Sequence, residues 1–295
     1  MNGLKQILAA TDLSDGAAQA VQRAALLAAE QRARLELLHV VDASELEAMR
    51  EVLRSSPDAP QRLLDDVAQT LRAQSGDIAR AAGVDVTARV AVGDVLSEIL
   101  SGCNGADLLA VGAHGLNWAR DMILGTTAER LLGKCRSPIL VVRHPAARAF
   151  ERVIVAVDFS SYSKSALKMA MAIAPQAAIT TVHAFEVPFE GQLRRAGITE
   201  ADIQSCRYEA RLRAVDAIRA LASEAADARI THVVEHGNAA RLILTQEDAL
   251  NAELIVIGKH GRTRTEEWLL GSVTRHILAD STCDVLVVQK GAEAV

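Results

Sequence analysis

The stretch ILAATDLS, residues 7–14, returns as VIVAVDFS at residues 153–160, a displacement of 146 positions (153 minus 7). The same displacement recurs near the end of each copy, where DLLAVG at 107–112 matches ELIVIG at 253–258 and ILVV at 139–142 matches VLVV at 285–288. A repeat of this length predicts two duplicated domains and not a solenoid of small units.

The size of the chain agrees with a duplication. At about 100 to 200 residues per domain, a chain of 295 residues is expected to form two domains. We expect them over residues 1–146 and 150–291, with His144–Arg148 as a short linker. Half of the residues are hydrophobic but only 3% are aromatic. Each core must therefore be built from Ala, Val, Leu and Ile, which suits parallel sheets flanked by helices.

Several classes of function are disfavoured by composition. The net charge of -5 argues against binding to a nucleic-acid backbone. The N-terminal apolar run is cut by Asp12 and is too brief for a signal peptide, and no stretch approaches the roughly 18 apolar residues that span a membrane. We therefore expect a cytoplasmic location. The four cysteines form no CxxC pair, which favours reduced structural thiols over a zinc site.

Apolar runs alternate with longer amphipathic stretches in each copy, a pattern typical of βαβ units. We predict an α/β fold with two repeated doubly wound domains, each built on a parallel five-stranded sheet. Strand two is expected at Leu35–Val41 and at Ile179–Phe185. The helix after strand one should pack on the sheet through apolar residues spaced i, i+3, i+4, i+7, which are Val21, Ala24, Ala25 and Ala28 in one copy and Leu167, Ala170, Met171 and Ala174 in the other.

Two further features concern strand edges. In the third strand of the first copy, Asp85, Thr87 and Arg89 alternate with valines and an alanine, which predicts an edge strand with one wet face. The last strand of each copy is Val-rich and would promote aggregation at an open edge. We expect residues 139–142 and 285–288 to pair antiparallel within one chain, so that a homodimer of whole chains would need another surface.

The long helix after strand two is expected to begin with a capping box in each copy. Asp58 with Gln61 opens it in the first copy and Thr199 with Asp202 in the second. The second pair matches the pattern less well.

A glycine-rich motif follows an apolar strand in both copies. Gly112-Ala113-His114-Gly115 precedes nine residues and then Gly125-Thr126, and Gly258-Lys259-His260-Gly261 precedes nine residues and then Gly271-Ser272. Glycines at a strand end let backbone N–H groups approach phosphate oxygens, and the following helix N-terminus adds a favourable dipole. The motif resembles the ATP-binding signature of universal stress proteins, G-x-x-G, nine residues, G-[ST]. The resemblance covers essentially the whole chain, twice.

The resemblance implies an adenine nucleotide, ATP with or without Mg²⁺, in a crevice between strands one and four, where the chain order reverses. Asp12 and Asp158 resemble the acidic residue near adenine and ribose, and Val40 and Ala184 the residue beside the base. Val111 and Ile257 resemble the residue before the first loop glycine. The ribose–phosphate cradle would be formed by Gly112, Gly115 and Gly125 and by Gly258, Gly261 and Gly271, with Thr126 and Ser272 as hydroxyl donors and Thr127 and Val273 following them. Arg262 keeps the basic residue that the family commonly has, whereas the first copy has Leu116 there.

Purely structural roles compete with this interpretation. The glycines would then only make tight turns, and Thr126 would be a helix N-cap whose capping box is completed by Glu129. Asp12 would cap the helix entered at Ser14.

The histidines favour structural roles. His114 and His260 lie inside the glycine turns without a Ser or Cys nucleophile signature, and we expect them to bond the backbone. His39 and His183 lie near the ends of apolar strands. We expect them to be hydrogen-bonded histidines at the edge of the core and not metal ligands.

Three functions remain in competition. The first is an ATP-binding stress-response or regulatory protein without committed chemistry, and slow ATP hydrolysis is its weak enzymatic variant. The second is an enzyme of the related PP-loop type, but such an enzyme should carry Ser-Gly-Gly-x-Asp-[Ser/Thr] after strand one, where this chain has Thr11-Asp12-Leu13-Ser14-Asp15-Gly16. The third is a ligand-free dimerisation scaffold.

Overall fold

A computed structural model describes residues 3–53, 56–115, 124–225, 229–261 and 269–289. One ten-stranded sheet runs through the molecule in the order β3-β2-β1-β4-β5-β10-β9-β6-β7-β8. Its strands are β1 (Gln6–Ala10), β2 (Arg34–Asp42), β3 (Val86–Gly93), β4 (Leu108–Gly112), β5 (Ile139–Val142), β6 (Arg152–Ala156), β7 (Ala178–Phe185), β8 (Ile230–His236), β9 (Leu254–Gly258) and β10 (Asp284–Val288). Within each copy the five strands are parallel, which confirms the duplicated doubly wound fold.

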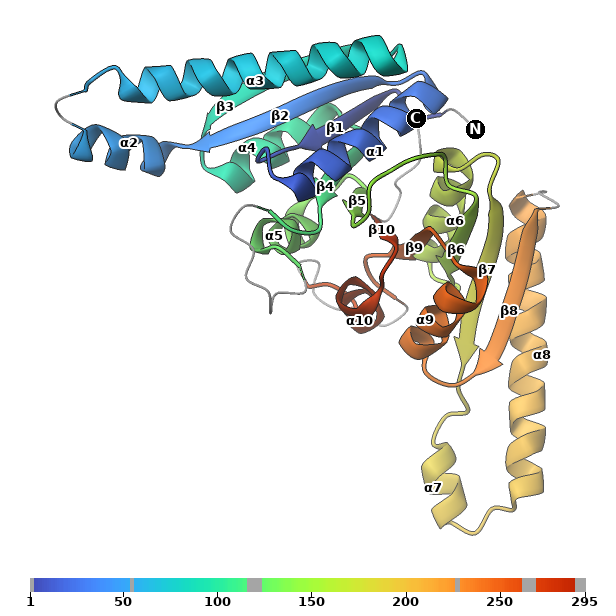
Figure 1. The fold of residues 1–295 in the computed structure, drawn as a ribbon. Coiled ribbons are helices and arrows are strands. Elements are labelled where there is room, and N and C mark those ends of the chain that lie inside the picture. The colour runs from blue at the N-terminus through green and yellow to red at the C-terminus, as the bar shows by residue number, and fades with distance from the viewer. Residues whose placement is uncertain (1–2, 54–55, 116–123, 226–228, 262–268, 290–295) are drawn as a thin grey trace.

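The two copies meet at their last strands. β5 and β10 pair antiparallel, with Val141 opposite Val285 and Ile139 opposite Val287. The predicted pairing is therefore confirmed, and Figure 1 shows the two halves joined at this seam. All residues of both strands are buried, so neither strand leaves an apolar edge open.

Helices cover both faces of the sheet (Figure 1). They are α1 (Asp15–Gln31), α2 (Ala43–Val52), α3 (Ala59–Ala82), α4 (Val95–Gly102), α5 (Thr126–Lys134), α6 (Ser161–Ile173), α7 (Glu190–Arg195), α8 (Glu200–Ala225), α9 (Ala239–Leu250) and α10 (Ser272–Asp280), with a 3₁₀ turn at Cys103–Gly105. Side chains of α1, α3, α6 and α8 belong to one hydrophobic cluster, and those of α4, α5, α9 and α10 to another on the opposite face. The sheet is thus the middle layer of three.

The predicted edge strand and packing helices are confirmed. β3 lies at the end of the sheet and contains no fully buried residue. The predicted apolar residues of α1 and α6 are buried, as are those of the central strands. None of the described helices is long and apolar enough to cross a bilayer.

The two predicted capping boxes differ in outcome. Asp58 stands at the start of α3 in a helical conformation, and its side chain makes no capping hydrogen bond, so the first predicted capping box is wrong. Pro60 in the first turn lacks an N–H, which removes one donor that a cap would satisfy. At α8 the Thr199 hydroxyl accepts the Asp202 amide at 3.2 Å and donates to its carboxylate at 2.6 Å. The pair that matches the capping-box pattern less well is therefore the one whose two residues form hydrogen bonds with each other.

The segment between β5 and β6 is packed against both copies. Ala146 and Phe150 are buried, and the Arg23 guanidinium lies 4.0 Å from the Phe150 ring centroid. Arg23 also pairs with buried Asp284 of the second copy, Nε to Oδ2 3.2 Å, and donates to the Arg148 carbonyl. The linker is therefore held in place by contacts with residues of both copies.

Candidate functional site

The carboxyl ends of β1 and β4 lie side by side in the sheet, and a cavity of about 230 Å³ opens there. A matching cavity of about 320 Å³ lies at the ends of β6 and β9. Both cavities occupy the predicted crevice at the point where the strand order reverses. Every residue proposed for binding lines one of them except Arg262, which falls outside the described residues, as do Leu116 and most of both nine-residue loops.

An aspartate forms one wall of each cavity. In the first copy Asp12 Oδ1 accepts the Ser14 amide at 3.0 Å and the Ser14 hydroxyl at 2.5 Å. Ser14, not Asp12, is the N-cap of α1, because its hydroxyl accepts the Ala17 amide. The interpretation of Asp12 as the helix cap is therefore wrong: Asp12 supports the capping residue.

The second copy repeats this arrangement with one change. Asp158 Oδ1 accepts the Ser160 amide at 3.0 Å and the Ser163 hydroxyl at 2.5 Å. Leu13 and Phe159, each following the aspartate, both adopt positive φ, 65° and 63°. This left-handed turn lets the strand enter the helix while the carboxylate stays beside the glycine loop.

The glycines make two different close approaches. A Cβ on Gly112 would lie 2.7 Å from the Gly16 carbonyl carbon, so this glycine is required where β4 ends against α1. A Cβ on Gly115 would lie 2.5 Å from Asp12 Oδ2, and one on Gly261 would lie 2.8 Å from Asp158 Oδ2. The second glycine of each motif thus allows the loop to approach the carboxylate.

The helix after each loop starts at the cavity. Gly125 is the N-cap of α5 and Gly271 that of α10, and neither position has a side-chain capping bond. The alternative in which Thr126 is an N-cap paired with Glu129 is wrong, because Thr126 already lies inside the helix. Residues 126–128 and 272–274 line the cavities, so the positive ends of both helices border them.

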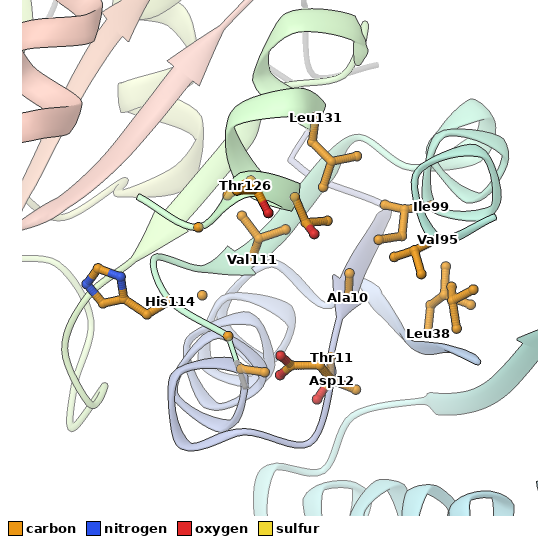
Figure 2. A pocket seen from close by; sticks show the side chains of 17 residues that line it. Ala10, Thr11, Asp12, Leu38, Val95, Ile99, Val111, His114, Thr126 and Leu131 are labelled. Carbon is orange, nitrogen blue, oxygen red and sulfur yellow. The ribbon is translucent and has the colours of Figure 1, made fainter. Parts of the chain in front are cut away.

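The opposite wall of the first cavity is apolar. Figure 2 shows Leu38, Val95 and Ile99 gathered on one side of the pocket, with Thr11 and Asp12 beside it. The ring of His114 points away from these residues (Figure 2). The cavity therefore combines an apolar side with a polar side formed by the carboxylate, the glycine loop and the helix start.

Two of the histidines are held by backbone carbonyls. His39 Nδ1 lies 2.9 Å from the Thr11 carbonyl oxygen and His183 Nδ1 lies 2.7 Å from that of Val157, so one nitrogen of each ring has the expected backbone partner. Burial lowers the pKa of His39, and it does so against the opposing effects of the carbonyl and of Asp12. Among the described residues no group of three His, Cys, Asp or Glu side chains could hold a metal ion.

The sequence model of the universal stress protein family matches residues 3–143 and again residues 149–289. The chain belongs to the universal stress protein family. A universal stress protein of Mycolicibacterium smegmatis is 24% identical over 298 residues, 96% of each chain. One from Methanocaldococcus jannaschii is 31% identical over 144 residues, which are 48% of this chain and 83% of that relative. The crystal structure of a universal stress protein from Archaeoglobus fulgidus has a TM-score of 0.66 at 20% identity, covering 97% of this chain and 98% of its own, and so shares the fold.

Each family match in this universal stress protein contains one glycine loop and one cavity. The two are not identical. The second cavity is lined by residues that the sequence analysis missed, namely Ser163, Thr274 and Arg275. The equivalent residues of the first copy are Ala17 and Ala128, which line the first cavity, and Glu129, which does not. The buried Thr274 hydroxyl donates to the Gly258 carbonyl at 2.8 Å and holds the loop against α10. Comparing the copies position by position at the repeat distance would have revealed these differences.

Lys259 is a second feature that sequence reasoning missed. It belongs to the second glycine motif, and its buried Nζ donates to the Gly133 carbonyl at the end of α5 in the first copy, at 2.6 Å. Ala113 occupies the equivalent position in the first copy. In this universal stress protein a hydrogen bond thus connects the glycine loop of the second site directly to α5, the helix that begins at the first site.

Proposed function

We propose that this universal stress protein binds ATP or another adenine nucleotide in both cavities, one in each of the domains 1–146 and 150–291. It would act in the cytoplasm as a nucleotide-dependent stress-response or regulatory protein. The observation that carries the proposal is the duplicated crevice in which a helix start without a side-chain cap faces an aspartate beside an apolar wall. Such a helix start offers backbone N–H donors to an anion.

The two sides of the first cavity suggest how a nucleotide would lie. The base would rest on the apolar side, near Val40 and Leu38, and the ribose near Asp12. The phosphates would meet the amides that begin α5 and the Thr126 hydroxyl. Glycine at position 115 would leave the backbone open to them.

The second cavity would seat a nucleotide in the same way. Ala184 would lie beside the base and Asp158 near the ribose, with Ser272 and Val273 at the phosphates. In both sites Mg²⁺ would be held by phosphate oxygens and water, since the described residues offer one lining carboxylate per cavity. Bound there, the ion would neutralise phosphate charge.

The β5–β10 seam favours a second candidate, a ligand-free scaffold that joins two domains. A simple experiment separates the two functions. The purified protein is denatured and the supernatant is assayed for adenine nucleotide by chromatography. Released nucleotide supports the proposal. If none is released and millimolar ATP does not raise the melting temperature of the protein, the scaffold is the better description.

A further inference from the structure

Among the described residues, one charged side chain of the second cavity has a residue of opposite charge at the equivalent position of the first copy. Arg275 lines the second cavity, and 146 positions earlier the first copy has Glu129. Both residues lie in the first turn of the helix that follows the loop: the Arg275 amide donates to the Gly271 carbonyl and the Glu129 amide to the Gly125 carbonyl, each at 3.0 Å. Both are exposed, and only Arg275 lines a cavity, whereas Glu129 directly follows Ala128, which lines the first one. A cation in the second site thus corresponds to an anion beside the first.

The other ionisable side chains that the structure describes in the two sites match. Among the described residues, the first cavity is lined by Asp12 and His114 as ionisable side chains, and the second by Asp158 and His260 together with Arg275. Each aspartate accepts an amide and a hydroxyl from the start of the following helix. Among the described residues, the difference in charge therefore lies at Glu129 against Arg275. The second cavity is also larger, about 320 Å³ against about 230 Å³.

We propose that the two sites select different adenine ligands: the second takes the nucleoside polyphosphate through Arg275, and the first, next to Glu129, prefers a ligand with few phosphates or none. This inference rests on the proposed function. A guanidinium binds phosphate oxygens with charge-assisted and often paired hydrogen bonds. A carboxylate in the first turn of α5 competes for the positive end of that helix and repels a phosphate chain.

Each site can be studied alone by filling the other. Ala10 and Ala156 are equivalent, partly buried residues, and they line the first and the second cavity respectively. Ala10→Trp should fill the first cavity so that only the second site can bind. Ala156→Trp should fill the second cavity so that only the first site can bind. Binding of ATP, AMP and adenosine is measured by calorimetry in both backgrounds, on protein freed of nucleotide. We expect the second site to bind ATP at least tenfold more tightly than adenosine, and the first site to bind AMP or adenosine more tightly than ATP.

Charge exchange tests the residues themselves. In the Ala10→Trp background, Arg275→Glu should weaken ATP binding about tenfold or more, leave adenosine binding unchanged and reduce the dependence of ATP binding on salt. Arg275→Lys should keep most of the affinity. In the Ala156→Trp background, Glu129→Arg should strengthen ATP binding about tenfold. Arg130→Glu and Asp280→Arg are matched controls, because these exposed residues change the net charge equally and do not line a cavity.

The outcomes separate this inference from the proposed function. If both sites bind adenine compounds with the same ATP-to-adenosine ratio, or if the controls have the same effect as the exchanges at 275 and 129, the inference is overturned and the proposed function stands. If no adenine compound binds in either background or in the unfilled chain, both are overturned. Should a tryptophan variant fail to fold, the exchanges are made in the unfilled chain, where Arg275→Glu should weaken the tighter of two ATP-binding events.

Discussion

At the residue scale, the closest constraint is between loop and carboxylate. Gly115 and Gly261 leave no room for a Cβ beside Asp12 and Asp158, and each aspartate accepts the amide of the serine that caps the next helix. Strand end, helix start and glycine loop are thereby fixed to one another in each copy. Within the described residues, these short-range contacts fix the strand end, the helix start and the glycines that line each cavity.

The position of Thr126 inside α5 leads to a prediction about stability. A threonine N-cap contributes about 1 kcal/mol, but Thr126 is not a cap. We expect Thr126→Val to change the free energy of unfolding by less than about 0.5 kcal/mol while weakening ATP binding at the first site. Ser14→Ala, which removes the true cap of α1, should cost about 1 kcal/mol. Urea denaturation compares the two variants, and equal losses would argue that Thr126 has a capping role.

At the element scale, patterns of apolar residues predicted the strands, the edge position of the third strand and the antiparallel pairing of 139–142 with 285–288. These features depend on local periodicity and on the need to cover apolar edges. The first turns of helices were predicted less well, as Asp58 and Thr126 show, because a cap depends on backbone angles that composition does not specify. Every residue that the resemblance implied for the site lines a cavity, apart from Arg262, which lies outside the described residues, and nucleotide binding by these residues stays a proposal.

Lys259 was missed for a different reason. Its partner, the Gly133 carbonyl, lies 126 positions away, and nothing local in the sequence connects the two residues. We expect Lys259→Met, which keeps most of the apolar stem, to cost about 1 to 2 kcal/mol of stability, since it removes a hydrogen bond from a charged group at a helix C-terminus. Lys5→Met, an exposed change before β1, is the control. Equal stability of the two variants by urea denaturation would contradict a structural role for the Lys259 contact.

At the scale of the whole molecule, the two copies form one continuous sheet. The seam is reinforced by Arg23 with Asp284 and by the Gln31 amide, which donates to the Ala172 carbonyl at 2.8 Å. Because the seam covers β5 and β10, a homodimer of whole chains would have to use another surface. Because the shared sheet and the contacts across the seam connect the two domains, we expect the domains to unfold together.

The seam can be tested with proline. Val141 and Val287 are fully buried between neighbouring strands, and proline at either position disrupts the ladder. Each of Val141→Pro and Val287→Pro should cost about 3 kcal/mol or more and reduce hydrogen-exchange protection in both domains. Val141→Ile should be much milder. Unchanged protection of the second domain in Val141→Pro would show that the domains do not depend on each other.

The central claim is that the duplicated glycine loops are two nucleotide sites, and calorimetric titration of nucleotide-free protein with ATP tests it most directly. The account predicts two bound equivalents in the native chain and in Gly76→Ala, a change on α3 where a Cβ meets nothing within 4 Å. It predicts one equivalent in Gly115→Val and in Gly261→Val, and none in the double variant. Each added valine side chain would occupy the space between its own loop and the neighbouring aspartate. No heat at millimolar ATP, or two equivalents in both single variants, would contradict it.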